Sequence, residues 1–229
     1  MSRQKKQYEW YQKDGAAQYH KTVFSDDEFV RHVIASNRAL KLQPFINDND
    51  EVLEYGVGVC LNLRYLKCKC RTGYDVSTYG KEACDEVGVE FCNDIELLKG
   101  RVFSKVICHH VLEHVPDPLT SLRQIKDLLA PGGRLVLCVP HERGRYYMRS
   151  SQDDIHHHLY SWNPRSIGNL LSEAGFVIND VSLGPYGYEQ RLAPLAKYSF
   201  VIYRVGLALL RAIKPVKEVV AIVEKPMNE

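Results

Sequence analysis

The sequence predicts an α/β fold: a doubly wound, seven-stranded, mostly parallel sheet with an antiparallel terminal strand and helices on both faces. The main observation is that, from Glu51 onward, short apolar runs of strand character alternate with helical stretches, as in βαβ units. A second observation is a loop with Gly56 and Gly58 directly after the first of these runs. A third is the globular composition, 45% hydrophobic and 25% charged over 229 residues, which excludes disordered, collagenous and coiled-coil chains.

The elements are predicted in order along the chain. A helix begins with a capping box of Ser25 and Glu28 and ends at Pro44. Strands are predicted at 51–55, 71–76, 89–92, 103–110, 133–140, 176–183 and 218–226. Helical stretches are predicted at 61–67, 81–86, 117–130 and 164–175. The last of these is opened by Asn163 as N-cap and Pro164 at the first helical position.

Charge and cysteine usage indicate where the protein works. The net charge is only +2 and the basic residues are scattered, so we expect no nucleic acid partner. The chain has an odd number of cysteines, seven, and is too long to need disulfides, which predicts buried thiols in a reducing compartment. The basic N-terminus is not followed by an apolar stretch, so we expect no signal peptide and a cytoplasmic protein.

The glycine loop lies where an α/β sheet presents bare backbone N–H groups to a ligand. By itself, Gly56-x-Gly58 is also compatible with a tight turn that binds nothing. Asp75 ends the second predicted strand, 17 residues past Gly58, where a carboxylate accepts hydrogen bonds from both hydroxyls of a ribose. Together the two features favour a nucleoside-containing ligand.

Two such ligands compete for this loop, a nicotinamide dinucleotide and S-adenosylmethionine. A dinucleotide site needs a third glycine, and Leu61 occupies its position. Glu54, at the start of the loop, would repel a pyrophosphate but attract an ammonium or sulfonium group. The electrostatics therefore favour S-adenosylmethionine.

From Val52 to Leu183 the chain resembles the class I S-adenosylmethionine-dependent methyltransferases, in the broad branch that acts on small molecules, lipid precursors or sugars. Four motifs carry the resemblance in order: EYGVGVC, YDVS, CNDIELL, and FSKVICHHVLEHVPDP leading through LRQIKDLLAPGGRLVLCVP. The stretch HHHLYSWNPRSIGNLLSEAGF resembles a further segment of many such enzymes. The resemblance implies a Rossmann-like fold, S-adenosyl-L-methionine as methyl donor and S-adenosyl-L-homocysteine as product. It also implies methyl transfer to an oxygen or nitrogen atom of a small-molecule, sugar or lipid-type acceptor.

Carried over residue by residue, the resemblance implies a set of donor-binding residues. These are Glu54, Tyr55, Gly56, Gly58, Asp75, Val76, Asp94, Ile95 and His109. Among them, Asp94 is expected at the adenine amino group. The loop departs from the family at Val57 and Cys60, where smaller residues are usual, and Ser104 stands for the usual aspartate. These departures motivate the alternative of a non-catalytic, methyltransferase-like binding or partner-stabilising protein, and a nicotinamide oxidoreductase is a third hypothesis.

Histidines gather at the predicted carboxyl edge of the sheet, where ligands bind in such folds. His110 ends the fourth strand and His158 precedes the next helix, and these two are our candidates for the general base. Three histidine-bearing segments would also permit a metal site, but each histidine has a simpler role, so we predict no metal. His114 is expected on the helix side, in a structural role.

Acceptor contacts are expected from Tyr19, His141, Arg143 and Tyr160. The loop after the fifth strand is basic and aromatic, which suits a phosphate or carboxylate on the acceptor. Its further members are Arg145, Tyr146, Tyr147 and Arg149. Aromatic residues near the N-terminus are expected either to cover the donor pocket or to pack on the sheet; these are Tyr8, Trp10, Tyr11 and Tyr19.

We expect one domain over 1–229, with an N-terminal helical cap at 1–48, a donor-binding core at 49–183, a helical insert or lid at 184–217 and a terminal strand at 218–226. In the insert, Lys197, Arg204 and Arg211 recur every seven residues in an otherwise apolar helix. Either the helix is buried with its basic side chains reaching solvent, or it lies on a membrane surface through 192–217. The sequence leaves the acceptor and the oligomeric state open.

Overall fold

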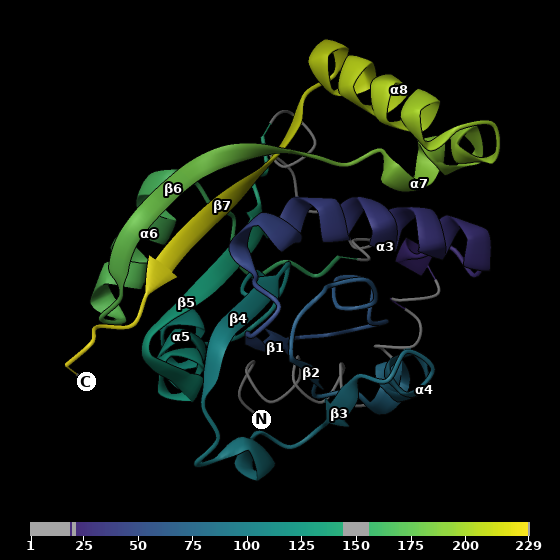
Figure 1. The fold of residues 1–229 in the computed structure, drawn as a ribbon. Helices are drawn as coiled ribbons and strands as arrows, with labels where there is room; N and C mark the ends of the chain where they lie inside the picture. Colours follow the sequence, from purple (N-terminus) through teal and green to yellow (C-terminus); the bar gives the residue numbers. More distant parts are fainter. Residues whose placement is uncertain (1–18, 20–21, 144–155, 229) are drawn as a thin grey trace.

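The computed structural model describes residues 19, 22–143 and 156–228, which contain one seven-stranded sheet in the order β3-β2-β1-β4-β5-β7-β6 (Figure 1). Strands β1 to β5 pair in parallel with their neighbours. Strand β7 lies between β5 and β6 and runs antiparallel to both. The predicted doubly wound, mostly parallel sheet with an antiparallel terminal strand is confirmed.

The strands match the predicted apolar runs, with shifts at their ends. Their bounds are β1 Glu51–Tyr55, β2 Cys70–Tyr74, β3 Glu90–Cys92, β4 Phe103–His109, β5 Leu129–Pro140, β6 Val177–Tyr186 and β7 Val216–Glu224. Strand β5 begins earlier than predicted, because Leu129 already pairs with Phe103 before a shift of register. Strand β6 extends to Tyr186 rather than ending at 183, since its last residues continue to pair with β7. The insert therefore begins after Tyr186.

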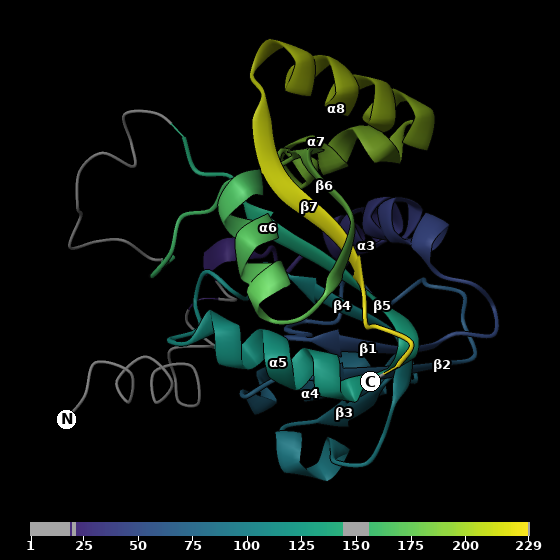
Figure 2. The same ribbon diagram turned by 90° about the vertical axis from the view of Figure 1, so that its left-hand side faces the viewer.

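The helices cover both faces of the sheet. Their bounds are α3 Glu28–Leu42, α4 Lys81–Asp85, α5 Pro118–Leu128, α6 Pro164–Glu173, α7 Glu189–Leu192 and α8 Phe200–Ile213. Short 3-10 helices are η1 Gln43–Phe45, η2 Thr78–Gly80, η3 Ile95–Leu98 and η5 Ala193–Lys197. Helices α5 and α6 lie on one face and α3 on the other (Figure 2). Helix α6 begins as predicted, with a capping box between Asn163 and Ser166 and Pro164 in its first turn.

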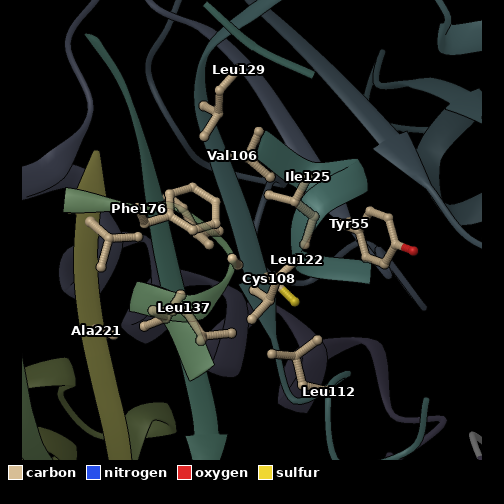
Figure 3. Packing of buried hydrophobic residues seen from close by; sticks show 14 of the residues in the cluster. Tyr55, Val106, Cys108, Leu112, Leu122, Ile125, Leu129, Leu137, Phe176 and Ala221 are labelled. Carbon is tan, nitrogen blue, oxygen red and sulfur yellow. The ribbon is translucent and has the colours of Figure 1, made fainter. Parts of the chain in front are cut away.

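Strand residues alternate between two hydrophobic cores, as expected for a sheet that is buried on both faces. On β4, Val106 and Cys108 face the core under α5 and α6, whereas Ile107 faces the core under α3 and α4. Figure 3 shows Leu122 and Ile125 of α5 packed over the first of these faces. Burial of each large apolar side chain contributes about 1.5–3 kcal/mol, so these two layers fix the strand register.

The predicted helix at 61–67 is wrong, because the structure has turns there. Leu61, Leu63 and Leu66 are buried, so their spacing anchors the turns to the core and does not mark a helix. The guanidinium of Arg71 donates to the carbonyl oxygens of Leu63 and Arg64, at 3.0 Å each. These bonds satisfy carbonyls that a helix would have used itself.

The capping box predicted for the first helix is also wrong. Asp27 is the N-cap of α3, and its carboxylate accepts hydrogen bonds from the N–H groups of Phe29 and Val30. The hydroxyl of Ser25 instead accepts the N–H of Asp27. Serine and aspartate are both strong N-cap residues, and the one adjacent to the first helical turn occupies the cap.

The insert packs on α3, beside the carboxyl edge of the sheet (Figures 1 and 2). Tyr203 and Leu207 of α8 are buried in a cluster with Val30, Val33 and Ile34 of α3. None of the helices in the described residues is long and apolar enough to cross a membrane. The opposite side of α8 is exposed and apolar. Its residues are Val201, Ile202, Val205, Leu209 and Ile213.

The insert's basic residues recur every seven positions in the sequence but do not share one environment in the structure. Arg211 is half-buried, donating to the carbonyl of Gly187 and to the carboxylate of Glu189. Lys197 lies over the ring of Phe29, whereas Arg204 is exposed. Of the seven cysteines, all free, five are buried as predicted, but Cys68 is half-buried and Cys70 is exposed at the start of β2.

Candidate active site

The carboxyl ends of β1, β2, β4 and β5 open into one cavity with a volume of about 1040 Å³. Helix α3 and the insert close its other side, contributing Arg38 and Tyr188 among others. Most of the predicted site residues line this cavity. They are Tyr19, Glu54, Tyr55, Gly56, Gly58, Asp75, Val76, Ile95, His109, His110, His141 and His158.

The glycine loop turns sharply at the end of β1. The N–H groups of Gly56 and Val57 both donate to the carbonyl of Tyr74, at 2.7 and 2.9 Å. Gly56 has a φ of +84°, and a Cβ there would lie 2.3 Å from the side chain of Val111. A larger residue would be strained and would also collide with the loop after β4.

The two departures in the loop leave the cavity open. Val57 is buried against Gly73, where a Cβ would lie only 2.8 Å from the valine side chain. Cys60 is buried in the same core, near Cys84, and is not among the residues that line the cavity. The bulk of both side chains is thus taken up by the core under α3 and α4.

Asp75 is positioned by the loop that precedes it. One carboxylate oxygen accepts the N–H of Gly58 and the other accepts the N–H of Ser77, at 2.9 Å each. Burial raises the pKa of this carboxyl, and the two backbone donors only partly offset that effect. The backbone thus fixes an aspartate side chain that retains acceptor capacity toward the cavity.

Glu54 is a fully buried carboxylate at the same end of β1. Its Oε1 accepts a hydrogen bond from the amide of Asn62, which in turn accepts from Arg38. Among the described residues, its Oε2 has no hydrogen-bond partner. Burial raises the pKa of Glu54 to about 8. A buried carboxylate with an orphaned oxygen on a cavity wall is a site for a cation or a hydrogen-bond donor supplied by a ligand.

His109 ends β4 and His110 follows it, beside a charge cluster on β7 and α3. The imidazole Nε2 of His110 lies 3.2 Å from Oε2 of Glu218, and Lys41 donates to the other oxygen of Glu218 at 2.5 Å. Burial lowers the pKa of His110, and the contact with Glu218 opposes that shift. Burial alone would raise the pKa of Glu218, but His110 and Lys41 hold it below its ordinary value. His110 is therefore a neutral imidazole held by a carboxylate at pH 7.

A second cluster adjoins the first, on the loops after β4 and before α6. His158 Nδ1 lies 2.5 Å from a carboxylate oxygen of Glu142. The ring of His114 packs edge-on against His158, with 4.8 Å between ring centroids. Glu113 is fully buried beside them, and burial raises its pKa to about 8. The expectation that His114 lies on the helix side is wrong, because it lines the cavity from the loop before α5.

Three predicted site residues are not among those that line the cavity. Asp94 is exposed and caps η3, accepting the N–H of Glu96. Arg143 is exposed. The hydroxyl of Tyr160 donates to the carbonyl of Pro116 and its ring stacks on Trp162, which is a packing role. The predicted contacts of Arg145, Tyr146, Tyr147, Arg149, Tyr8, Trp10 and Tyr11 lie outside the described residues.

Sequence reasoning missed Glu113 and Glu218. Glu218 stands 108 positions from His110, so only the antiparallel placement of β7 brings them together. Glu113 lies inside the VLEHVPDP motif. The only hint in the sequence was its position directly after Leu112, an apolar residue that is buried in the structure. Burial of that acid could not be predicted from a loop sequence.

The sheet order, the glycine loop after β1 and the carboxylate after β2 define a class of protein, the class I methyltransferases, whose methyl donor is S-adenosylmethionine. Residues 27–181 match the methyltransferase domain family, and this match covers more than half of the chain. The chain belongs to this family, which confirms the resemblance found in the motifs.

Known relatives agree with this assignment. A ubiquinone biosynthesis O-methyltransferase of Xanthomonas axonopodis pv. citri (strain 306) is 28% identical over 130 residues, which are 51% of this chain and 54% of the relative. The chain thus spans about half the length of the curated relatives that it matches.

Solved structures share the fold. The 1,6-didemethyltoxoflavin-N1-methyltransferase of Burkholderia thailandensis, determined with its substrate and S-adenosylhomocysteine, has a TM-score of 0.63 at 18% identity and covers 99% of this chain and 92% of its own. An S-adenosylmethionine-dependent methyltransferase of Thermotoga maritima has a TM-score of 0.61 at 19% identity, with coverages of 92% and 99%. At these identities the likeness establishes a common fold.

Proposed function

We propose that this chain transfers a methyl group from S-adenosylmethionine to a hydroxyl oxygen of a small-molecule acceptor. The observation that carries the proposal is the arrangement of polar groups in the cavity. Glu54, whose Oε2 has no partner among the described residues, lies with Asp75 at the glycine-loop end, and His110 lies just after β4. Transfer to oxygen is favoured over nitrogen because the curated relatives reported above are named O-methyltransferases.

The residues present suit the donor. The orphaned oxygen of Glu54 would accept a hydrogen bond from the donor's ammonium group. Asp75 would accept hydrogen bonds from the ribose hydroxyls. The bare backbone at Gly56 and Gly58 would allow close approach of the methionine portion. When bound, the donor supplies a methyl group on a sulfonium, which departs as a neutral thioether that keeps the electron pair of the broken S–C bond.

His110 would act as the general base toward the acceptor hydroxyl. With Nε2 facing Glu218, the neutral imidazole donates its proton there and leaves Nδ1 as the accepting nitrogen. Nδ1 would take the hydroxyl proton as the oxygen forms its bond to the methyl carbon. A base in this role contributes about 10² to 10⁴-fold, and alignment of the two reactants supplies up to about 7–11 kcal/mol.

The test is direct. The purified full chain is first titrated with S-adenosylhomocysteine in a calorimeter, where we expect one site with a dissociation constant in the micromolar range. It is then incubated with methyl-labelled donor and a panel of phenols, hydroxylated lipids, sugars and amines. Transfer to hydroxyl-bearing acceptors supports the proposal, whereas transfer to amines alone or the absence of donor binding contradicts it.

The exposed face of α8 suits a peripheral contact with an anionic membrane. Its apolar side chains face away from the protein, Val201 being 70% and Ile213 75% exposed. From Tyr198 to Lys217 there is no acidic residue, while Arg204 and Lys214 are exposed cations. An amphipathic helix with this pattern lies in the plane of a membrane surface, with its cations at the headgroups. In that position the adjoining cavity would receive lipid-type acceptors.

The alternative of a non-catalytic binding or partner-stabilising protein has no specific observation in its favour. It was motivated by Val57 and Cys60. Cys60 is buried in the core and does not line the cavity, whereas Val57 lines the cavity and also packs in that core against Gly73. Donor binding without any turnover over the whole acceptor panel is the result that would restore it.

A further inference from the structure

We propose that Glu113, His114 and His158 form a binding site for one divalent transition-metal ion of the Zn²⁺ type on the wall of the cavity. One ligand atom from each of these residues lies within 4.8 Å of the others. From the sequence we predicted no metal, because each histidine had a simpler role. The three ligands come instead from two loops that meet only in the fold.

Hydrogen bonds to backbone carbonyls hold these two loops together. The N–H of Leu159 donates to the carbonyl of Glu113 at 2.7 Å, and the hydroxyl of Tyr160 donates to the carbonyl of Pro116 at 2.9 Å. Leu112 is fully buried in the core next to Glu113. The positions of the three ligands are therefore set by the packing of both loops and do not depend on chance contacts of their side chains.

Glu113 supplies the independent observation. It is fully buried, and among the described residues neither of its carboxylate oxygens has a hydrogen-bond partner. Among the described residues, imidazole nitrogens of His110 and His114 lie 3.9 Å from Oε1, too far for hydrogen bonds. A buried carboxylate without partners is costly to the fold, and a cation between it and the histidines would supply the missing partner.

His158 has the partner that a ligating histidine needs. Its Nδ1 is hydrogen-bonded to the carboxylate of Glu142, which leaves Nε2 to bind an ion. A carboxylate hydrogen-bonded to the other nitrogen of a metal-binding histidine is a common arrangement. Four-coordinate Zn²⁺ holds its ligands roughly 3.4 Å apart, with bonds of about 2.0–2.1 Å. The three side chains would therefore close up by about 1 Å on binding.

A neighbouring cluster of the same chemistry shows the contrast. His109, His110 and Glu218 also present three ligand atoms within 4.8 Å. There, however, Lys41 already lies 2.5 Å from one carboxylate oxygen of Glu218, and His110 lies 3.2 Å from the other. In that cluster the ammonium group of Lys41 is the cation beside the carboxylate of Glu218. The ion pairs described for Glu113 involve histidines only.

The donor set selects the ion. Two imidazoles and one carboxylate favour first-row transition ions over Mg²⁺ and Ca²⁺, which prefer all-oxygen sites. Three protein ligands leave a coordination position for a ligand from the cavity, as in catalytic zinc sites. If the proposed function holds, that ligand is the acceptor oxygen, whose pKa the ion would lower beside His110. The ion's binding itself does not depend on that role.

The test uses the full chain, treated with a chelator and desalted, and titrated with Zn²⁺ in a calorimeter. We expect one equivalent of Zn²⁺ to bind with a micromolar or lower dissociation constant. At a free Zn²⁺ concentration 100 times that constant, the melting temperature should rise by roughly 5–10 °C. Glu113→Gln and His158→Gln should each weaken binding at least tenfold. His157→Asn is the matched control, because His157 is exposed in the same loop and asparagine tolerates its φ of +50°.

A Co²⁺ titration distinguishes this site from surface thiols. Visible d–d bands without sulfur-to-metal charge transfer in the near-ultraviolet support the histidine and carboxylate ligands, whereas strong charge transfer assigns the ion to Cys68 and Cys70. Absence of binding, or binding that survives Glu113→Gln unchanged, overturns the inference. S-adenosylhomocysteine is titrated separately into the metal-free protein. Binding of that compound without binding of Zn²⁺ defeats this inference alone, and the reverse result defeats the proposed function alone.

Discussion

Nε2 of His110 lies 3.2 Å from Oε2 of Glu218, although the two residues are 108 positions apart in the chain. His110 directly follows the central strand β4, and Glu218 lies on β7, which reaches the neighbourhood by running antiparallel along β5. The pair places a carboxylate behind a neutral imidazole at the ligand-binding edge of the sheet. Such a carboxylate fixes the tautomer and orientation of the ring.

His110→Asn should lower turnover by about 10² to 10⁴-fold while leaving donor affinity within about threefold, because it removes the base and no proposed donor contact. Asparagine is chosen because His110 has a φ of +57°, which asparagine tolerates better than alanine. Turnover is measured with labelled donor, and affinity by calorimetry with S-adenosylhomocysteine. His157→Asn, at a φ of +50°, is the control for the backbone. Unchanged turnover in His110→Asn would assign the proton transfer to another group.

Glu218→Gln should move the pH profile as well as reduce the rate. The carboxylate raises the pKa of His110 against the effect of burial, so its removal lowers that pKa. Because a base must be neutral to act, the acidic limb of kcat/KM should shift to lower pH. A purely structural role for Glu218 would reduce activity at all pH values without moving that limb, and a measured profile from pH 5 to 9 separates the two outcomes.

Glu54→Gln should weaken donor binding at least tenfold, because the buried carboxylate oxygen that would meet the ammonium group is lost. The same variant should stabilise the donor-free protein. Burial raises the folded-state pKa of Glu54 from 4.5 to about 8, so the folded state holds a proton that the unfolded chain releases. Wild-type stability then falls by up to about 1.4 kcal/mol per pH unit across this window.

Urea unfolding of both proteins between pH 5 and 8 measures this effect. The stability advantage of Glu54→Gln should grow as pH rises and level off above about pH 8. A difference that stays constant over this range would mean that Glu54 titrates near its ordinary value.

Asp75→Asn should weaken donor binding at least tenfold, since an amide offers one acceptor oxygen where the carboxylate offers two. The side chain also organises the loop by accepting the N–H groups of Gly58 and Ser77. Asp127→Asn is the control, because Asp127 is exposed on α5 away from the cavity. Equal donor affinity in both variants would reject Asp75 as the ribose contact.

The apolar face of α8 should bind anionic vesicles in a salt-sensitive manner. In flotation with phosphatidylglycerol vesicles, Arg204→Gln with Lys214→Gln should weaken binding by about tenfold or more, at about 1 kcal/mol per charge. Val205→Ser with Leu209→Ser should abolish it, because these side chains are 53% and 59% exposed and provide the apolar contact. Lys99→Gln with Arg123→Gln is the charge-matched control. No flotation on either anionic or neutral vesicles would leave α8 as a packed lid.

Most of the scaffold could be predicted from the sequence because local patterns carry it. The alternating apolar runs, the glycines after β1 and the cap at Asn163 act over a few residues each, and they specified the succession of strands along the chain and the glycine-loop end of the cavity. The prediction at 61–67 was wrong because the apolar spacing there anchors turns. The guanidinium of Arg71, on the following strand, donates to the carbonyl oxygens that a helix would use.

By itself, the sequence determined the family through its motifs. It also determined the positions of the glycine loop and of the carboxylates Glu54 and Asp75, because these lie at the ends of strands that their own apolar runs define. Only the tertiary structure decided which charged groups share a wall of the cavity. His110 meets Glu218 through β7, and Glu113 meets His158 because two separate loops are bonded together. Burial and long-range pairing control the charges of these groups, and both depend on elements far apart in the chain, which no local pattern records.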